Sequence, residues 1–314
     1  MQRPSSLTTA SLFTRKDLLL TGTLSVAYLL LSSFLIGFKS EQLILVVLFN
    51  TLYYLSAATR KFITGFSIFM IFWIIFDYMK AFPNYHYNTV HIESLYQAEK
   101  KLFGIWQDGR LLTPNEYWSL HRYTLLDIAA GIFYLCWVPV PLAFAGFLFF
   151  KDRRQFLYFS LSFLLVNLIG FAFYYIYPAA PPWYVQQYGF GFIPGTPGNT
   201  AGLAAFDRIF HVEVFKALYA KSSNVFAAMP SLHAAYPLIV LYYGIKNKLG
   251  AVNLLFVLVM AGIWFSAVYS GHHYVLDVLA GIACSVTGIF LFKWLSEKQP
   301  LVKKGLAAFE KAIR

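Results

Sequence analysis

The chain has 314 residues, of which 59% are hydrophobic and 12% are charged, and its mean hydropathy is +0.59. A soluble domain carries about 25% charged residues, so this composition leaves too little polar surface to enclose a globule. It also excludes disorder, a collagen-like repeat and a disulfide-stapled module. The net charge of +11 lies in short clusters between apolar runs, which is typical of a multi-span membrane protein rather than a nucleic-acid-binding one. The sequence therefore predicts an all-α integral membrane protein.

Eight apolar runs are candidates for membrane spans, each of which needs about 20 residues. They lie at 18–38, 42–57, 62–80, 124–150, 155–177, 231–246, 251–269 and 273–294. The second and sixth runs are short, so we expect their ends to include flanking polar residues. We interpret the first run as an uncleaved span, because its apolar stretch is long for a signal peptide.

The distribution of Lys and Arg predicts the orientation. Eight spans put both termini on one side, and that side carries 16 of the 25 basic residues while the other side carries 9. Because basic loops resist translocation, we expect the side with 16 to be cytoplasmic. The outer side is then the periplasm for a bacterial inner membrane, or the lumen for a eukaryotic Golgi membrane.

The chain divides into three predicted parts. These are an N-terminal transmembrane hairpin over 1–60, a bundle over 61–296 with outer loops 81–123 and 178–230, and a basic cytoplasmic tail over 297–314. An amphipathic stretch at Ile92–Phe103 is expected along the outer interface, and a helical patch near Leu203–Ala220. We interpret the tail either as an amphipathic segment on anionic lipid or as a frayed solvated end.

Ionisable side chains inside apolar spans are costly and usually functional. In this sequence they lie near the outer ends of the predicted spans, at Asp77, Asp127, His233, His273 and Asp277. A merely tolerated set would scatter in depth. The pattern therefore predicts a polar pocket on the outer side.

The sharpest motif is Tyr269-Ser-Gly-His-His-Tyr-Val-Leu-Asp277. On a helix, His273 and Asp277 would share one face. A carboxylate there accepts the proton on one imidazole nitrogen and raises the nucleophilicity of the other. The pair alone also fits a helix start without chemistry, and the pattern supports a metal-ligand role no better.

A second motif, Met229-Pro-Ser-Leu-His233, begins the sixth span, with Ser231 as its expected N-cap. Spans six and seven form a hairpin, which should bring His233 and His273 together at the outer surface. Both helix starts would aim backbone N–H groups at the same space, which favours phosphate. The sequence therefore predicts a phosphoryl-transfer site, for which we expect no metal and no other cofactor.

These motifs resemble the type-2 phosphatidic acid phosphatase superfamily, whose signatures are Lys-x6-Arg-Pro, Pro-Ser-Gly-His and Ser-Arg-x5-His-x3-Asp. Leu232 replaces the signature Gly, Ala267 replaces the Arg, and Pro178–Tyr184 contains no Lys or Arg. The Ala-Pro-Pro-Trp-Tyr turn, Pro-Ser-Leu-His and His-His-Tyr-x2-Asp look most like the aureobasidin-resistance branch, the inositol phosphorylceramide synthases. The resemblance covers about residues 80–285.

The resemblance implies a six-helix core bundle with two additional N-terminal helices. It also implies a head-group transferase that moves phosphoinositol from phosphatidylinositol to a ceramide-type acceptor through a phosphohistidine intermediate. His273 would attack phosphorus with the help of Asp277, and His233 would protonate the leaving oxygen. The expected partners are therefore membrane lipids. The residues alone leave the head group open, since inositol, choline and ethanolamine phosphates all fit, and they leave any accessory subunit or oligomer open.

The missing signature cations bear on the choice of substrate. A phosphodiester carries one negative charge and a phosphomonoester nearly two, so a site without these cations suits the diester better. This favours a transferase over the alternative, a lipid phosphate or isoprenyl diphosphate phosphatase. The counter-hypothesis is that Lys221, Arg208 or Arg122 folds back to supply charge. A transporter is disfavoured because no internal repeat is present.

Seven further residues are candidates for substrate binding: Asp127, Asp77, Trp183, Tyr184, Ser231, Lys221 and His272. The two aspartates either bind polyol hydroxyls or join helices, and the two aromatics either line a lipid entrance or are ordinary interfacial residues. His272 would point about a hundred degrees from His273 on an ideal helix, so we do not expect it to be catalytic. The run Ser222, Ser223 and Asn224 is expected either to orient the outer loop or to contact phosphate.

Overall fold

The computed structural model describes residues 12–221 and 224–314. Within these residues the fold is all-α apart from one short hairpin. The helices are α1 (Arg15–Ile36), α2 (Ser40–Leu55), α3 (Ala57–Tyr78), α4 (Glu93–Phe103), α5 (Pro114–Leu120), α6 (Thr124–Leu135), α7 (Pro139–Lys151), α8 (Arg153–Ile176), α9 (Pro182–Tyr188), α10 (Ala204–Phe210), α11 (Val214–Ala220), α12 (Leu232–Lys246), α13 (Val252–Tyr269), α14 (Val275–Lys298) and α15 (Pro300–Ile313). Short 3-10 turns lie at Met79–Ala81, Asn84–His86 and Ala201–Leu203.

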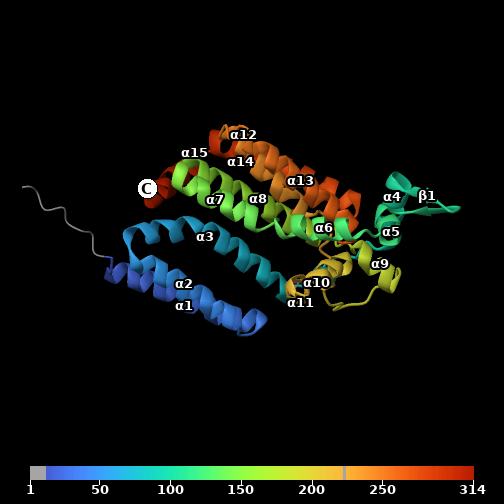
Figure 1. The fold of residues 1–314 in the computed structure, drawn as a ribbon. Helices are drawn as coiled ribbons and strands as arrows, with labels where there is room; N and C mark the ends of the chain where they lie inside the picture. Colours follow the sequence, from blue (N-terminus) through green and yellow to red (C-terminus); the bar gives the residue numbers. More distant parts are fainter. Residues whose placement is uncertain (1–11, 222–223) are drawn as a thin grey trace, which may run out of the picture.

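Each predicted span corresponds to a helix or a helix pair (Figure 1). Five helices in the described residues are long and apolar enough to cross a membrane, namely α1, α3, α8, α13 and α14, and the bent pair α6–α7 makes a sixth. Helices α2 and α12 have 16 and 15 residues. The chain is thus a multi-pass membrane protein, and a total of eight spans remains a prediction.

Local sequence explains where these helices begin and bend. Ser56 and Asp152 cap α3 and α8 by accepting backbone N–H bonds from the first turn. The axes of α6 and α7 differ by 40°. Pro139 opens α7, and because proline lacks an N–H, an uninterrupted helix through this point is disfavoured.

The outer loop at 81–123 contains a hairpin that we did not predict, formed by β1 (Ile105–Gln107) and β2 (Arg110–Leu112). Asp108 and Gly109 make its turn with φ of 49° and 73°. Such Asp-Gly pairs favour two-residue hairpin turns, so the sequence did carry the signal. The helical patch expected near Leu203–Ala220 is confirmed as α10 with α11. The amphipathic stretch at Ile92–Phe103 forms α4, and its place along the membrane interface remains a prediction.

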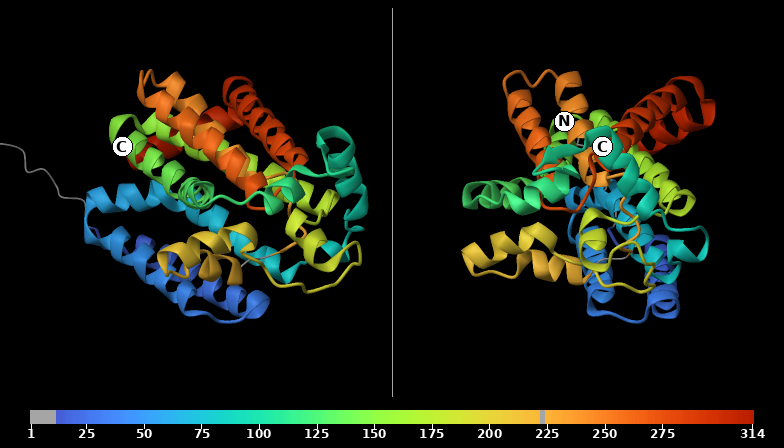
Figure 2. Two further views of the ribbon diagram at one scale, coloured as in Figure 1. Left: turned by 45° about the vertical axis from the view of Figure 1, so that its right-hand side comes forward. Right: turned by 90° about the vertical axis from the view of Figure 1, so that its right-hand side faces the viewer.

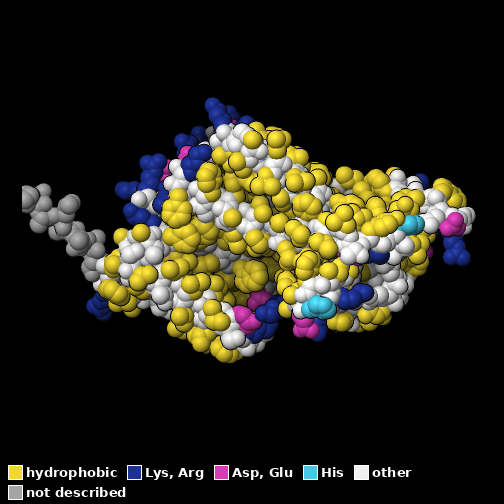
Figure 3. Space-filling view, in the orientation of Figure 1, with side chains coloured by type: hydrophobic (Ala, Val, Ile, Leu, Met, Phe, Trp, Pro, Cys, Tyr) yellow, Lys and Arg dark blue, Asp and Glu magenta, His cyan; other side chains and the backbone are white. Residues whose placement is uncertain are grey.

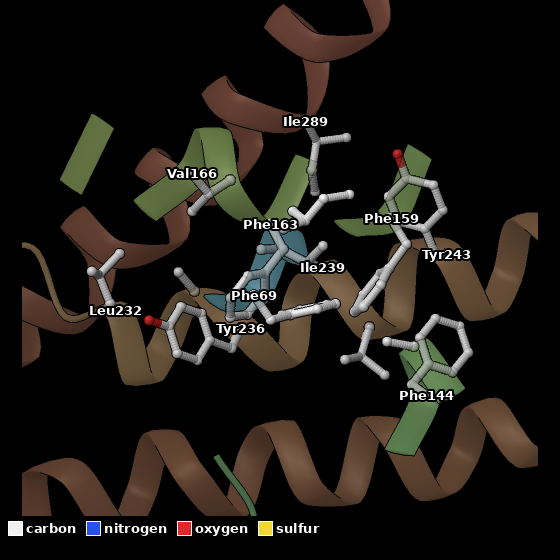
Figure 4. Close-up of a cluster of buried hydrophobic side chains, with 14 of the residues drawn as sticks. Phe69, Phe144, Phe159, Phe163, Val166, Leu232, Tyr236, Ile239, Tyr243 and Ile289 are labelled. Carbon is white, nitrogen blue, oxygen red and sulfur yellow. The ribbon is translucent and has the colours of Figure 1, made fainter. Parts of the chain in front are cut away.

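An aromatic core joins α3, α7, α8, α12 and α14 (Figure 4). The rings of Phe163 and Tyr236 are 4.5 Å apart between α8 and α12. Gly170 of α8 leaves room for Leu232, since a Cβ at Gly170 would lie 2.7 Å from the Leu232 side chain. This packing fixes the start of α12, and with it the place of His233.

The two ends of the bundle differ. The outer segments with α4, α5, β1 and α9–α11 lie at one end, and the start of α1 lies with α15 at the other (Figure 1). Figure 3 shows many Lys and Arg side chains at the α15 end and apolar side chains along the middle. Figure 2 shows α10 and α11 beside α6, and α10 packs against α6. Both termini of the described chain thus lie at the same end, as an even number of spans requires.

The C-terminal tail is a helix rather than a frayed end. Helix α15 packs on α3, α8 and α14, with Leu306 and Ile313 buried. The Nζ of Lys61 donates to the Arg314 backbone carbonyl at 2.6 Å. The frayed alternative is therefore wrong, and contact of this helix with anionic lipid remains a prediction.

Candidate active site

His272 and His273 lie in the turn between α13 and α14, ahead of the first α14 residue, Val275. Gly271 has a φ of +77°, and the backbone N–H groups of both histidines donate to the Ala267 carbonyl, at 3.2 and 3.0 Å. The prediction that His273 sits inside a helix is wrong, because the chain turns here before α14 starts. The argument from helical angles against His272 fails for the same reason.

The two predicted histidines meet. His233 is the second residue of α12, and its Nδ1 lies 3.1 Å from Nε2 of His273. Ser231 is the N-cap of α12, as expected, and its hydroxyl accepts from Ala234 N at 3.3 Å. Its own N–H donates to the Asp277 carbonyl at 2.9 Å, which ties the start of α12 to α14. The α12–α13 hairpin therefore brings together side chains that are 40 residues apart.

The second nitrogen of His273 has two oxygens near it. Its Nδ1 is 3.0 Å from the Ala228 carbonyl and 3.6 Å from Oδ2 of Asp277. The first distance is a hydrogen bond and the second is too long for one. Asp277 Oδ2 instead accepts the Tyr274 N–H at 2.8 Å. Donation to the Ala228 carbonyl puts the proton on Nδ1, so Nε2 keeps its lone pair facing His233.

A cavity of about 140 Å³ opens beside the histidine pair. It is lined by Phe76, Met79, Tyr134, Tyr174, Pro181, Trp183, Gly198, Asn199, Tyr219, Asn224, Val225, Ala227, Ala228, His233, His272 and His273. None of these described residues is Lys, Arg, Asp or Glu. Within 12–221 and 224–314, no group of three or more His, Cys, Asp and Glu side chains is arranged to hold a metal ion.

His272 forms part of the cavity wall. Its Nε2 lies 3.0 Å from the Thr200 carbonyl, and its ring stacks on Tyr219 with centroids 4.3 Å apart. Burial, with His273 as a second cause, lowers the pKa of His272 to about 3. The ring is therefore neutral at pH 7, with a proton on Nε2 for Thr200 and an acceptor at Nδ1.

Sequence reasoning missed most of the aromatic wall. The Tyr134 ring lies 5.0 Å from that of His233, and Trp137 lies 4.5 Å from it. Both come from the α6–α7 region, where they look like ordinary members of an apolar span. Tyr219 was inside the predicted helical patch but carried no signal of its own.

The other substrate-binding candidates divide into two groups. Trp183 and Asn224 line the cavity, whereas Tyr184, Asp77 and Lys221 do not. The Tyr184 hydroxyl donates to the Gly191 carbonyl and accepts from Ile193 N, so it shapes the outer loop. Asp77 pairs with Lys80 at 2.5 Å, and Lys221 pairs with Glu41 at 2.9 Å. Ser222 and Ser223 lie outside the described residues.

Asp127 also lies away from the cavity lining. It forms an ion pair with Arg122 and accepts from the Tyr269 hydroxyl at 2.9 Å. Arg122 further donates to the carbonyls of Tyr269 and Gly202, at 3.0 and 2.7 Å. Arg122 is thus held by structural partners.

Arg208 is exposed, and Lys221 is held by Glu41. In the part of the chain that the structure describes, none of the three cations in the counter-hypothesis, Lys221, Arg208 and Arg122, lines the cavity.

The start of α14 is not open to phosphate. The carboxylate of Glu99, from α4, accepts the N–H groups of Val275 at 2.9 Å and Leu276 at 3.1 Å. Asp277 takes the N–H of Tyr274. The expectation that both helix starts offer free N–H groups is wrong for α14, because carboxylates of the protein already fill that anion site.

Fold and site together define an all-α multi-pass membrane protein with a histidine pair in a buried cavity. The model of the PAP2 superfamily matches residues 93–291, which span α4 to α14. The chain therefore belongs to the PAP2 superfamily. No solved structure matches it.

Within this superfamily, the chain is similar to several curated synthases. The chain is 48% identical to the phosphoinositol dihydroceramide synthase of Bacteroides thetaiotaomicron over 89% of this chain and 92% of that protein. It is 28% identical to the inositol phosphorylceramide synthase of Candida albicans, over 58% of this chain and 40% of the relative. It is 33% identical to the inositol phosphorylceramide synthase catalytic subunit of Saccharomyces cerevisiae, over 41% of this chain and 31% of the relative.

Proposed function

We propose that this chain is a phosphoinositol transferase that moves phosphoinositol from phosphatidylinositol to a ceramide-type acceptor. The observation that carries the proposal is the 3.1 Å contact between His233 and His273 beside a cavity without charged side chains. The likeness over nine-tenths of the chain to a phosphoinositol dihydroceramide synthase supports the choice of head group and acceptor.

In the first half-reaction, Nε2 of His273 attacks the phosphorus of the donor lipid. The N–P bond forms as the bond from phosphorus to the diacylglycerol oxygen breaks. His233 enters this step as the imidazolium, gives one proton to that oxygen and is left as neutral imidazole. The Ala228 carbonyl holds the proton on Nδ1 of His273 and thereby keeps Nε2 nucleophilic. Phosphorus must approach Nε2, so donor binding has to break the His233–His273 hydrogen bond.

In the second half-reaction, the acceptor hydroxyl attacks the phosphohistidine. His233, now without its proton, takes the hydroxyl proton as the new P–O bond forms and the N–P bond breaks. The Oδ2 atom of Asp277 lies 3.6 Å from Nδ1 of His273. Its negative charge therefore stabilises the positive charge that the His273 ring carries when it is bonded to phosphorus. The residues return to their starting protonation after each cycle.

The charge of the cavity favours this reaction over removal of a phosphomonoester. The described lining residues include no Lys or Arg to balance a second negative charge. Two of the three cations in the counter-hypothesis, Arg122 and Lys221, are paired with Asp127 and Glu41. A phosphodiester carries a single negative charge, which hydrogen bonds from the histidine imidazoles can balance without a cation.

Neutral polar groups on the wall suit a polyol head group. His272 offers an acceptor at Nδ1, because its Nε2 faces the Thr200 carbonyl. The hydroxyl of the fully buried Tyr134 interacts with Tyr219, which also lines the cavity. We assign these two groups to the inositol hydroxyls, and Trp183 to the entrance for the lipid chains.

The site is proposed to face the extracytoplasmic side, in a bacterial inner membrane. The support is the grouping of Lys and Arg side chains at the α15 end of the bundle (Figure 3), whereas the outer segments α4, α5 and α9 lie at the other end (Figure 1).

The test is the product formed by purified protein from phosphatidylinositol labelled in the head group. With dihydroceramide present, we expect labelled inositol phosphorylceramide and an equal amount of diacylglycerol. Release of inositol phosphate at the same rate with or without acceptor would contradict the proposal. Rapid release of inorganic phosphate from phosphatidic acid, with no transfer, would support the phosphatase alternative.

A further inference from the structure

The outer segment α4–α5 holds the backbone of the His273 turn from two sides. Glu99 of α4 accepts the N–H groups of Val275 and Leu276. Asn115 of α5 donates from Nδ2 to the carbonyls of His273 and Val268, both at 2.8 Å. Asn115 thus binds the backbone of His273 itself and of Val268 before it, and Glu99 binds the backbone two and three residues after it.

Both contacts are costly to build. The Glu99 side chain is 0% exposed and Asn115 is 1% exposed. The described residues give Glu99 no Lys or Arg partner, so its charge is balanced only by the N–H groups and dipole of α14. A buried carboxylate with no ion-pair partner is a poor source of stability. A role in fixing the position of the His273 turn explains the buried Glu99 carboxylate better than a role in stability does.

We propose that Glu99 and Asn115 are positioning residues that hold Nε2 of His273 in line with the phosphorus of the donor. The inference rests on the proposed function, because it concerns the same histidine. Neither side chain lines the cavity, so neither is expected to touch a substrate.

The pKa of Glu99 distinguishes a positioning role from a stabilising one. Burial raises the pKa of Glu99 to about 7, with the charge of Asp277 adding to the rise and the two backbone N–H groups opposing it. The titratable groups that interact with it are Asp277 of α14 and Tyr274, the residue before α14. At pH 8 the ionised form of Glu99 therefore lowers the stability of the fold, although it still accepts the Val275 and Leu276 N–H groups. Replacing it with a neutral side chain should spare the fold and impair the reaction.

The experiment compares Glu99→Gln and Asn115→Ala with Glu116→Gln as a matched control. Glu116 lies in the same outer segment, caps α5 and accepts from the Tyr96 hydroxyl, but it does not contact the turn. Gln keeps the α5 capping box. For each full-length variant, kcat, KM for phosphatidylinositol, Tm at pH 8 and amide hydrogen exchange of residues 270–277 are measured.

We expect Glu99→Gln to lower kcat by about 100-fold, the effect of misplacing a reacting group by about 1 Å. KM and Tm should stay near wild type, and exchange at Val275 and Leu276 should rise. Asn115→Ala should lower kcat by about tenfold. Glu116→Gln should match wild type in all four measurements.

Unchanged kcat and unchanged exchange in Glu99→Gln would overturn the inference, as would a loss of activity that only follows a loss of Tm. The proposed function fails separately, if wild-type protein forms no inositol phosphorylceramide. Hydrogen exchange can be measured without turnover. It therefore tests whether Glu99 and Asn115 hold the His273 turn even if the proposed function fails.

Discussion

The middle of the bundle and its outer end are built in different ways. In the middle, aromatic side chains of α3, α8 and α12 interdigitate, and any apolar residue of suitable volume serves the fold. At the outer end, single polar side chains bind single backbone groups, as Glu99 and Asn115 do at the His273 turn. The core therefore sets which helices are neighbours, and the outer end sets where one imidazole nitrogen points. A change in the first region should affect stability, and a change in the second should affect rate.

The largest expected effect is that of His273→Ala. Removal of the nucleophile should lower transfer by about 10⁴-fold or more, as in enzymes that lose the attacking residue. Tm should fall less than in a variant of the aromatic core, because His273 lines the cavity and is not part of that core. Product formation and thermal unfolding, measured on the same preparation, check both parts. Substantial transfer by this variant would contradict the proposed chemistry.

Phe163→Ala, a substitution in the aromatic core, should lower stability and leave the rate of the reaction unchanged. Phe163 is 4% exposed and packs on Tyr236, Phe69 and Phe159. Loss of the ring should cost about 3–5 kcal/mol of unfolding free energy. The kcat of the protein that remains folded should stay near wild type. A fall in kcat without a fall in stability would break the distinction between the two regions.

The pH dependence of stability tests whether the Glu99 carboxylate titrates near neutral pH. Its pKa is raised from 4.5 to about 7, so the native state binds a proton more tightly than the unfolded chain. Its contribution to stability is therefore fully present below pH 4.5 and is lost as the pH rises to about 7. Wild type should lose Tm between pH 5 and pH 8 relative to Glu99→Gln. Parallel Tm profiles for the two proteins would show that Glu99 does not titrate in this way.

The smallest expected effect is that of Lys221→Ala. The Lys221–Glu41 pair joins α11 to α2 at an exposed position, where ion pairs contribute little. Because Lys221 does not line the cavity, kcat and KM should match wild type within error. A large rise in KM for the donor lipid would instead revive the hypothesis that this lysine supplies charge to the site.

The parts that could be predicted from sequence are those fixed by local pattern. Apolar runs predicted the long helices, and the hairpin of α12 and α13 predicted that His233 and His273 meet. The parts that could not be predicted depend on contacts across long separations. The bond from His273 to the Ala228 carbonyl spans 45 residues, and that from Glu99 to Val275 spans 176. A backbone carbonyl leaves no mark in a sequence, and a lone Glu in an amphipathic helix looks like a solvated residue.

The most direct measurement of the central claim is the identity of the residue that carries the phosphoinositol between the two half-reactions. Labelled phosphatidylinositol is added without acceptor, the protein is quenched at alkaline pH, and its peptides are analysed by mass spectrometry. The account predicts a phosphoinositol adduct on His273 that is absent from His273→Ala and disappears when dihydroceramide is added. Full transfer with no adduct on His273, or an adduct that dihydroceramide does not discharge, would contradict it.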